Sequence, residues 1–167
     1  MIGIIGAKGF VGSAFVRWCE RQGQPCTPID VDNYASVVGS SFDILVNANG
    51  NSRKPLSVEQ PLLDFQMSVE SVVKSTLDFK YKKYVFLSSC DVYSLTSTPE
   101  GNRESDLDPK GEGPAPSGPP QSRYGFHKYM AEQYARLGAS DWMVFRLAGM
   151  VGEGLRKNAV FDALNGG

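Results

Sequence analysis

The sequence predicts an α/β fold in which a doubly wound parallel sheet carries helices on both faces. Short apolar runs alternate with segments whose apolar residues recur every three or four positions, as strands that alternate with helices do. A glycine-rich turn follows the first apolar run directly, where a strand would lead into a helix. The 167 residues have the length of one domain and can bury a sizeable core. We therefore predict one domain over residues 1–167.

Three strands are predicted in the first half of the chain. The first covers residues 2–5, the second ends at residues 29–30 and the third covers residues 44–47. Residues 31–41 are weakly patterned and leave little room for another strand and helix. The first two strands are therefore joined by one helix, and the third follows without a full helical crossover.

Two helices accompany these strands. The first ends before Gly23 and Pro25, because glycine terminates helices and proline cannot continue them. Its apolar stripe comprises Val11, Phe15, Trp18 and Cys19. The second is long and begins near Pro61, and its apolar stripe comprises Leu62, Phe65, Val69, Val72, Val73 and Thr76. This stripe suits either burial within the chain or pairing with a second copy.

The second half of the chain predicts two further strands and two helices. They are a strand over residues 84–87 ending at Ser88 and Ser89, a helix ending at Leu137 and Gly138, a strand over residues 143–147 and a short helix over residues 157–164. The segment between Tyr93 and Tyr124 is rich in proline, glycine and serine, which excludes a strand or helix there. We interpret it as a mobile surface insertion, with a lid over a substrate as the alternative.

Composition excludes several classes of partner. The chain has 17 Lys plus Arg against 18 Asp plus Glu, so no general basic field attracts nucleic acid or an anionic membrane. The cysteines, Cys19, Cys26 and Cys90, are odd in number and lack Cys-x-x-Cys spacing, which argues against a disulfide framework and a zinc site. The apolar start is too short for a signal peptide or membrane span. We predict a cytoplasmic protein with small-molecule ligands and no metal.

The glycine turn reads Gly6-Ala7-Lys8-Gly9-Phe10-Val11-Gly12. Gly6 permits a tight turn out of the strand, Gly9 lets backbone approach a pyrophosphate, and Gly12 lets the helix pack closely on the sheet. Amide groups at the helix start then face the phosphates. Because the motif follows a strand and opens a helix, it predicts dinucleotide binding in a Rossmann-like fold.

Asp30 indicates which dinucleotide binds. It lies 18 residues after Gly12 at a strand end, where a carboxylate accepts hydrogen bonds from the adenosine ribose of NAD and repels the extra phosphate of NADP. Asp32 is the alternative acceptor, and either carboxylate also suits a solvated turn. Lys8 favours NADP instead, since its charge attracts a phosphate. We predict NAD, with NADP not excluded.

Tyr124 and Lys128 lie one helical turn apart, so they share one helix face. A free phenol titrates near pH ~10, so a tyrosine base working near neutrality needs about three units of help, or roughly 4 kcal/mol. The Lys128 ammonium, together with the positive nicotinamide ring of an oxidised cofactor, favours the phenolate. The pair therefore predicts a redox active site.

Several motifs occur in a specific order along the chain. They are the glycine motif at residues 6–12, Asn47-Ala48-Asn49-Gly50, Ser88-Ser89-Cys90-Asp91-Val92-Tyr93, Tyr124-x-x-x-Lys128 followed by Glu132, and Arg146 with Gly152 downstream. In this combination the chain resembles the extended short-chain dehydrogenase/reductases of the NAD-dependent epimerase/dehydratase group. The resemblance implies an NAD(P)-dependent oxidoreductase, epimerase or dehydratase acting on a sugar-like alcohol such as a nucleotide sugar. It also implies homodimers in many relatives, and a C-terminal substrate lobe that is mostly absent from these 167 residues.

The resemblance also assigns roles to residues. Ser89, four places before Tyr93, is the catalytic hydroxyl beside Tyr124 and Lys128, with Ser88 as the alternative. The cofactor-lining residues are Gly6, Lys8, Gly9, Phe10, Val11, Gly12, Asp30, Asn47, Ala48, Asn49, Tyr124 and Lys128. Candidate substrate contacts are Ser88, Asp91 and Arg53. The chain departs from the family at Asn49, where a second alanine is common, and at Leu147, where a proline is common.

Other residues keep a structural interpretation beside the functional one. Asp91 matches an acid/base position of dehydratase relatives but is equally suited to cap a turn. Arg53 and Lys54 suit a substrate phosphate or a solvated turn, and Cys90 suits a buried filler. His127 points away from the face of Tyr124 and Lys128, so a surface or packing role is predicted. A non-catalytic dinucleotide-binding module that senses or scaffolds remains the alternative to an enzyme.

Overall fold

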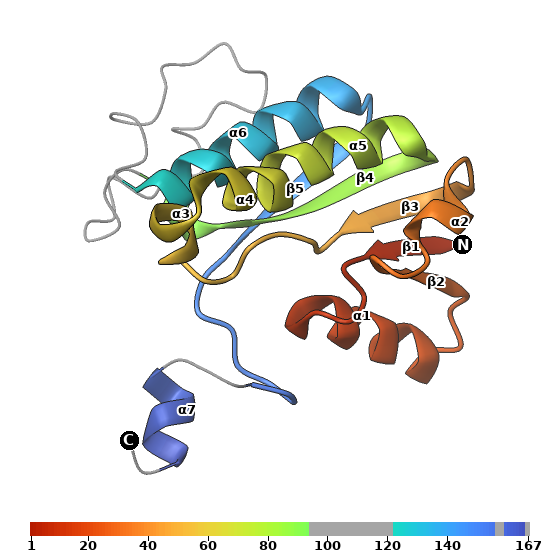
Figure 1. Cartoon of the computed structure of the whole chain (residues 1–167). Coiled ribbons are helices and arrows are strands. Elements are labelled where there is room, and N and C mark those ends of the chain that lie inside the picture. Colours follow the sequence, from red (N-terminus) through yellow and green to blue (C-terminus); the bar gives the residue numbers. More distant parts are fainter. Residues whose placement is uncertain (94–121, 156–158, 166–167) are drawn as a thin grey trace.

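The computed structural model describes residues 1–93, 122–155 and 159–165. The strands among these residues form one parallel sheet (Figure 1). Within them the sheet has five strands in the order β2-β1-β3-β4-β5, and every neighbouring pair is parallel. The strands are β1 (Ile2–Ile5), β2 (Cys26–Ile29), β3 (Ser41–Asn47), β4 (Lys80–Ser89) and β5 (Trp142–Leu147). The predicted parallel sheet is confirmed.

The helices of the described residues fall between these strands. They are α1 (Phe10–Arg21), α2 (Tyr34–Val37), α3 (Leu56–Glu59), α4 (Pro61–Phe65), α5 (Ser71–Asp78), α6 (Arg123–Gly138) and α7 (Ala159–Leu164). A π-helical turn over Gln66–Glu70 joins α4 to α5, and a 3-10 turn over Cys90–Val92 follows β4. The long helix predicted from Pro61 is therefore a continuous helical run with one wide turn inside it.

Helices cover both faces of the sheet, as predicted. α1 lies on one face, whereas α4, α5 and α6 lie on the other (Figure 1). On the α1 face, Val46, Val85 and Leu87 pack with partly buried residues that include Val11 and Phe15. On the opposite face the core includes Leu45, Val69, Val72, Tyr84, Phe86, Ala131 and Ala135. These two apolar layers make the fold Rossmann-like and doubly wound.

The strand order creates a switch point beside β1. The chain leaves β1 through α1 to β2 on one side and then returns to β3 on the other side. Ile5 at the end of β1 pairs with Ile29 and with Asn47, and Asn47 pairs with Phe86 in β4. The carboxyl ends of these strands therefore meet at one edge, where open parallel sheets bind their ligands.

Several predicted boundaries and faces are wrong. β3 and β4 begin three and four residues earlier than predicted, at Ser41 and Lys80, because the early residues of both strands pair with each other in half-exposed alternation. Trp18 and Leu62, predicted on buried stripes, are 51% and 69% exposed. Leu62 lies before the π turn, which shifts the buried face of the helical run. Pairing of two copies through this helix stays a prediction.

The remaining fold predictions concern the segment between β2 and β3, two segments outside the described residues, and the absence of a membrane span. Residues 31–41 contain the one-turn helix α2 and the first residue of β3, so no further strand lies between β2 and β3. In the described sheet β2 is an edge strand, where Pro28 costs no ladder bond. The predicted insertion, residues 94–121, and the start of the last helix, residues 156–158, lie outside the described residues. Among the residues with described structure, no helix combines the length and apolar character that a membrane crossing needs. A cytoplasmic location stays a prediction.

Candidate active site

The turn between β1 and α1 has no room for a side chain at its three glycine positions. Gly6 adopts a positive φ of 76°, and a Cβ there would lie 2.9 Å from the Asn49 nitrogen. A Cβ on Gly12 would lie 2.1 Å from the Gly6 carbonyl oxygen, and one on Gly9 3.1 Å from it. Gly9 is the N-cap of α1 and supplies no side-chain hydrogen bond to the first turn. The α1 amides are therefore left to the solvent or to a ligand.

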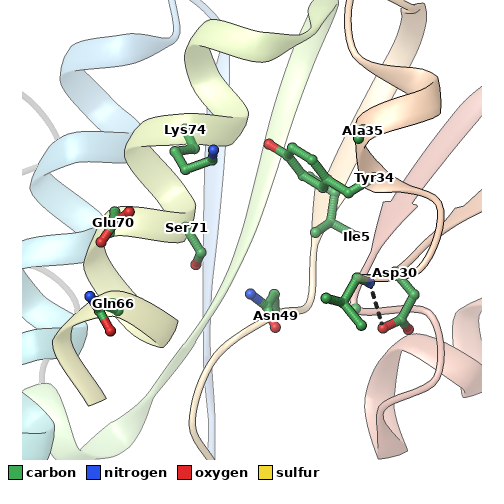
Figure 2. A pocket seen from close by; sticks show the side chains of 11 residues that line it. Ile5, Asp30, Tyr34, Ala35, Asn49, Gln66, Glu70, Ser71 and Lys74 are labelled. Carbon is green, nitrogen blue, oxygen red and sulfur yellow. Dashed lines mark hydrogen bonds between the residues drawn. The ribbon is translucent and has the colours of Figure 1, made fainter. Parts of the chain in front are cut away.

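A cleft of about 560 Å³ opens beside this turn (Figure 2). Figure 2 shows Asp30 and Tyr34 on one side, Lys74 on the facing helix, and Asn49 between them. The lining residues are Ile5, Gly6, Asp30, Val31, Tyr34, Ala35, Asn49, Gln66, Glu70, Ser71 and Lys74. The lining residues that come from α2, the π turn and α5 were not predicted, because no local pattern in the sequence indicates which helix face borders a cleft.

Asp30 lies in this cleft and already holds the glycine turn. Its carboxylate accepts hydrogen bonds from the backbone N–H groups of Lys8, at 2.7 Å, and Val31, at 3.0 Å. Because a carboxylate offers about four lone pairs, acceptor capacity remains for another donor. The Lys8 ammonium forms an ion pair with Asp32 at the surface, and this hydrogen bond raises the Lys8 pKa. Asp32 is thus engaged outside the lining of the cleft.

The strand-end residues Asn47 and Asn49 are placed differently. Asn47 is fully buried, and its side-chain amide donates to the hydroxyls of Ser75, at 3.1 Å, and Tyr84, at 2.9 Å. Its side-chain oxygen accepts from the Asn49 backbone N–H at 2.9 Å. The Asn47 side chain therefore fixes the turn from inside the core. Asn49, and not the Asn47 side chain, reaches the cleft.

The structure brings Ser89, Tyr124 and Lys128 together. Ser122 caps the start of α6 by accepting from the Gly125 N–H at 3.0 Å, and a Cβ on Gly125 would lie 2.0 Å from the Asp91 carbonyl oxygen. The start of α6 therefore packs directly against the 3-10 turn that follows β4. The Ser89 side chain then lies close enough to the Tyr124 phenol to oppose part of the rise in the Tyr124 pKa, and the Lys128 nitrogen lies 6.0 Å from the Tyr124 ring centroid.

The cluster borders the cleft through residues 49 and 50. A Cβ on Gly50 would lie 2.6 Å from the Lys128 nitrogen, so Gly50 makes room for the ammonium. Asn49, its neighbour, lines the cleft. Ser88, the alternative hydroxyl, is buried and has no hydrogen-bond partner among the residues that the structure describes. Ser89 is therefore the strand-end hydroxyl that contacts Tyr124.

Burial dominates the electrostatics of the tyrosine and the lysine. It raises the pKa of Tyr124 to about 12, with the charge of Asp91 as the next cause. Burial also lowers the pKa of Lys128 to about 8, against the opposing charges of Asp64 and Glu132. In the protein alone, burial outweighs the effect of the Lys128 charge on Tyr124, because desolvation disfavours both charged forms, so the predicted shift toward the phenolate in the presence of an oxidised cofactor stays a prediction. The sequence argument also invoked a cofactor charge.

Asp91 joins the cluster through its side chain. One carboxylate oxygen accepts from the Ser89 hydroxyl at 2.9 Å, and the other accepts from the Lys54 ammonium at 2.7 Å. The Asp91 N–H donates to Ser89 at 3.2 Å, so the residue also belongs to the capped 3-10 turn. Both predicted roles for Asp91 thus remain open. Arg53, by contrast, forms an exposed pair with Glu59 at 3.3 Å, which agrees with a solvated turn.

Two buried polar contacts, Arg146 with Glu132 and His127 with Asp64, lie next to the cluster. Arg146 binds Glu132 through two contacts of 2.7 and 3.0 Å and also donates to the Tyr93 hydroxyl at 3.1 Å. His127 is buried, 2.6 Å from the fully buried Asp64, so its predicted packing role is confirmed and the surface role is wrong. Burial raises the pKa of the Cys90 thiol, which agrees with a filler.

The fold and this site define a Rossmann-like domain with a strand-end serine, a tyrosine and a lysine gathered beside a cleft at the switch point of the sheet. A family model described as the NAD dependent epimerase/dehydratase family matches residues 2–164. The chain belongs to this family. A comparison with curated proteins found no match.

Solved structures share the fold at low sequence identity. A dTDP-4-dehydrorhamnose reductase from Clostridium acetobutylicum is 17% identical with a TM-score of 0.73, over 98% of this chain and 58% of that one. A UDP-galactose 4-epimerase is 21% identical with a TM-score of 0.70, over 99% and 61%. MoeE5 in complex with UDP-glucuronic acid and NAD is 17% identical with a TM-score of 0.66, over 86% and 52%. The chain thus spans about half to three fifths of these proteins.

Proposed function

We propose that this chain binds a nicotinamide dinucleotide at the glycine turn and supplies Ser89, Tyr124 and Lys128 as catalytic residues. The substrate class is a sugar-like alcohol or ketone carried on a nucleotide, and the reaction is a reduction, epimerisation or dehydration. The observation that carries the proposal is the convergence of these three side chains next to the cleft at the switch point. Membership of the family supports it.

The residues present fit a dinucleotide. The turn at Gly9 and Gly12 exposes backbone and the start of a 12-residue helix to a pyrophosphate. The cleft volume of about 560 Å³ is typical of small-molecule sites. Asp30 retains acceptor capacity for ribose hydroxyls, and the Lys8 charge is directed to Asp32. These features support NAD, while release of Lys8 from Asp32 would favour NADP.

Each catalytic side chain has a role that follows from its surroundings. When bound, the nicotinamide supplies the redox chemistry. Because its pKa lies at about 12, Tyr124 holds its proton near neutrality and is set to donate it to a substrate carbonyl oxygen. Ser89 stabilises the same oxygen by a hydrogen bond as charge develops there. Lys128 places a positive charge beside the phenol and is positioned to hold the nicotinamide ribose.

The substrate contacts follow the same geometry. The Asp91 carboxylate accepts a hydrogen bond from the Ser89 hydroxyl. It is therefore our candidate for the second proton transfer that a dehydration requires. Lys54 keeps this carboxylate paired at 2.7 Å. Arg53 remains a candidate for a substrate phosphate only after leaving Glu59.

Replacement of Tyr124 by phenylalanine tests the proposal. We expect Tyr124→Phe to lower kcat by roughly 10²- to 10⁴-fold with a panel of UDP- and dTDP-sugars, because a positioned proton donor contributes that much. Calorimetric affinity for NAD should stay within about twofold, since phenylalanine keeps the ring that lines the cofactor and lacks only the hydroxyl. Tyr134→Phe is the matched control, because Tyr134 lies on the same helix and is 42% exposed.

Two outcomes decide against the enzyme. If the wild-type chain binds NAD or NADP but turns over none of these sugars, it is a dinucleotide-binding module. If it binds neither dinucleotide, the proposal as a whole fails. An unchanged NAD to NADP preference in Asp30→Ala would remove Asp30 from the cofactor site.

A further inference from the structure

Lys128 shares the protein interior with two buried carboxylates, Asp64 of α4 and Glu132 of α6. Lys128 is 4% exposed and both carboxylates are 0% exposed. A buried ammonium is costly unless an opposite charge compensates it. The side chain that supplies this charge therefore decides whether the lysine stays protonated.

Glu132 is the weaker of the two counter-charges. Its carboxylate binds the Arg146 guanidinium through two contacts of 2.7 and 3.0 Å. The two opposite charges largely cancel at the distance of a third group. Asp64 then remains as the buried carboxylate that can compensate Lys128.

Asp64 is held by the same two segments that surround Lys128. It accepts from the Asn51 amide at 2.7 Å and lies 2.6 Å from Nδ1 of His127. Asn51 follows Gly50, which leaves room for the Lys128 nitrogen, and His127 precedes Lys128 in α6. The His127 ring also packs edge-on against Phe65 at a centroid distance of 5.5 Å. The carboxylate is thus held by Asn51 and His127, which are sequence neighbours of Gly50 and Lys128.

The groups that face Lys128 come from several elements. Tyr124 and Glu132 lie on its own helix, Asp64 on α4, and the Phe86 ring of β4 lies 5.7 Å from its nitrogen. The charge of Asp64 opposes the lowering of the Lys128 pKa by burial, and it also raises the Tyr124 pKa. One carboxylate therefore acts on both proposed catalytic groups.

We propose that Asp64 is the counter-charge that keeps Lys128 protonated, and that His127 and Asn51 are positioning residues that hold Asp64 in place. This inference deepens the proposed function, because it concerns the charge of the same lysine.

The Lys128 titration can be followed by NMR of lysine-labelled protein, without cofactor or substrate. We expect Asp64→Asn to move its midpoint to lower pH by about one unit, as loss of a nearby opposite charge does. His127→Asn keeps a side-chain donor within reach of Asp64 and should leave the midpoint at the wild-type pH. Asp141→Asn, which removes a carboxylate paired with Lys83 before β5, is the control and should also leave it unchanged.

The inference is overturned if folded Asp64→Asn keeps the wild-type midpoint, or if Asp141→Asn shifts it equally. If Asp64→Asn does not fold, Asp64→Asn combined with Lys128→Met should fold, because the unpaired buried ammonium is gone. Failure of that rescue also overturns the inference. Because no measurement involves the dinucleotide, a missing activity would count against the proposed function alone.

Discussion

Charged side chains pair in solvent at the amino ends of the strands, whereas the carboxyl ends hold buried ion pairs in addition to exposed ones such as Lys8–Asp32. Asp43 binds the N-terminal ammonium and Lys82, and Lys83 binds Asp141, with at least one partner of each pair more than half exposed. At the other end, the Glu132–Arg146 pair has side-chain exposures of 0% and 11%. Exposed pairs contribute little, while breaking a buried pair leaves an uncompensated charge. The fold thus concentrates its costly electrostatics next to the proposed site.

The largest expected effect comes from Arg146→Met. It would leave Glu132 buried without its cation and should lower the free energy of unfolding by about 3 to 5 kcal/mol. Urea unfolding at neutral pH measures this change. Removing both charges in Glu132→Leu with Arg146→Met should recover much of the loss. A loss below about 1 kcal/mol for Arg146→Met would show that this end of the sheet behaves like the exposed end.

A smaller effect should appear in the pH dependence of stability. The pKa of Lys128 lies at about 8 in the folded chain, against an ordinary value of 10.5. Between these values the unfolded chain binds more protons than the folded chain, so the free energy of unfolding rises with pH. The rise should be at most about 3 kcal/mol. Urea unfolding between pH 8 and 10 tests it, and Lys128→Met should lack the rise.

The smallest effect is expected at the exposed end. Lys82 and the N-terminal ammonium hold the pKa of Asp43 at about 2, below its ordinary value of 3.8. Its stabilisation is therefore present above the ordinary value and is lost as the pH falls toward 2. Because the pair is exposed and screened, Asp43→Asn should leave the urea midpoint at neutral pH unchanged. A decrease as large as that of Arg146→Met would remove the contrast between the two ends.

Local patterns in the sequence predicted most of the fold. The apolar run at residues 2–5 and the glycine turn defined β1 and the start of α1, and one-turn spacing placed Tyr124 and Lys128 on one face of α6. The end of β4 at Ser89 was also predicted. These features depend on neighbouring residues, whose preferences the sequence displays directly.

The parts that were missed depend on contacts between distant segments. Lys54 meets Asp91 across 37 residues, and His127 meets Asp64 across 63 residues. A helical stripe identifies apolar positions, so it gave no sign that a carboxylate at position 64 faces inward. The raised Tyr124 pKa likewise follows from how deeply α6 packs against β4, which spacing alone does not indicate.

The π turn over Gln66–Glu70 decides where Asp64 points. Asp64 and Val72 are both fully buried although they lie eight residues apart, and in a regular α-helix that separation overshoots two full turns by about 80°. The wide turn absorbs this angular excess and returns both residues to one side of the helical run. Tightening this segment into a regular α-helix with the same number of residues would rotate the aspartate by that angle relative to Val72 and out of the interior, without altering any amino acid that touches the lysine.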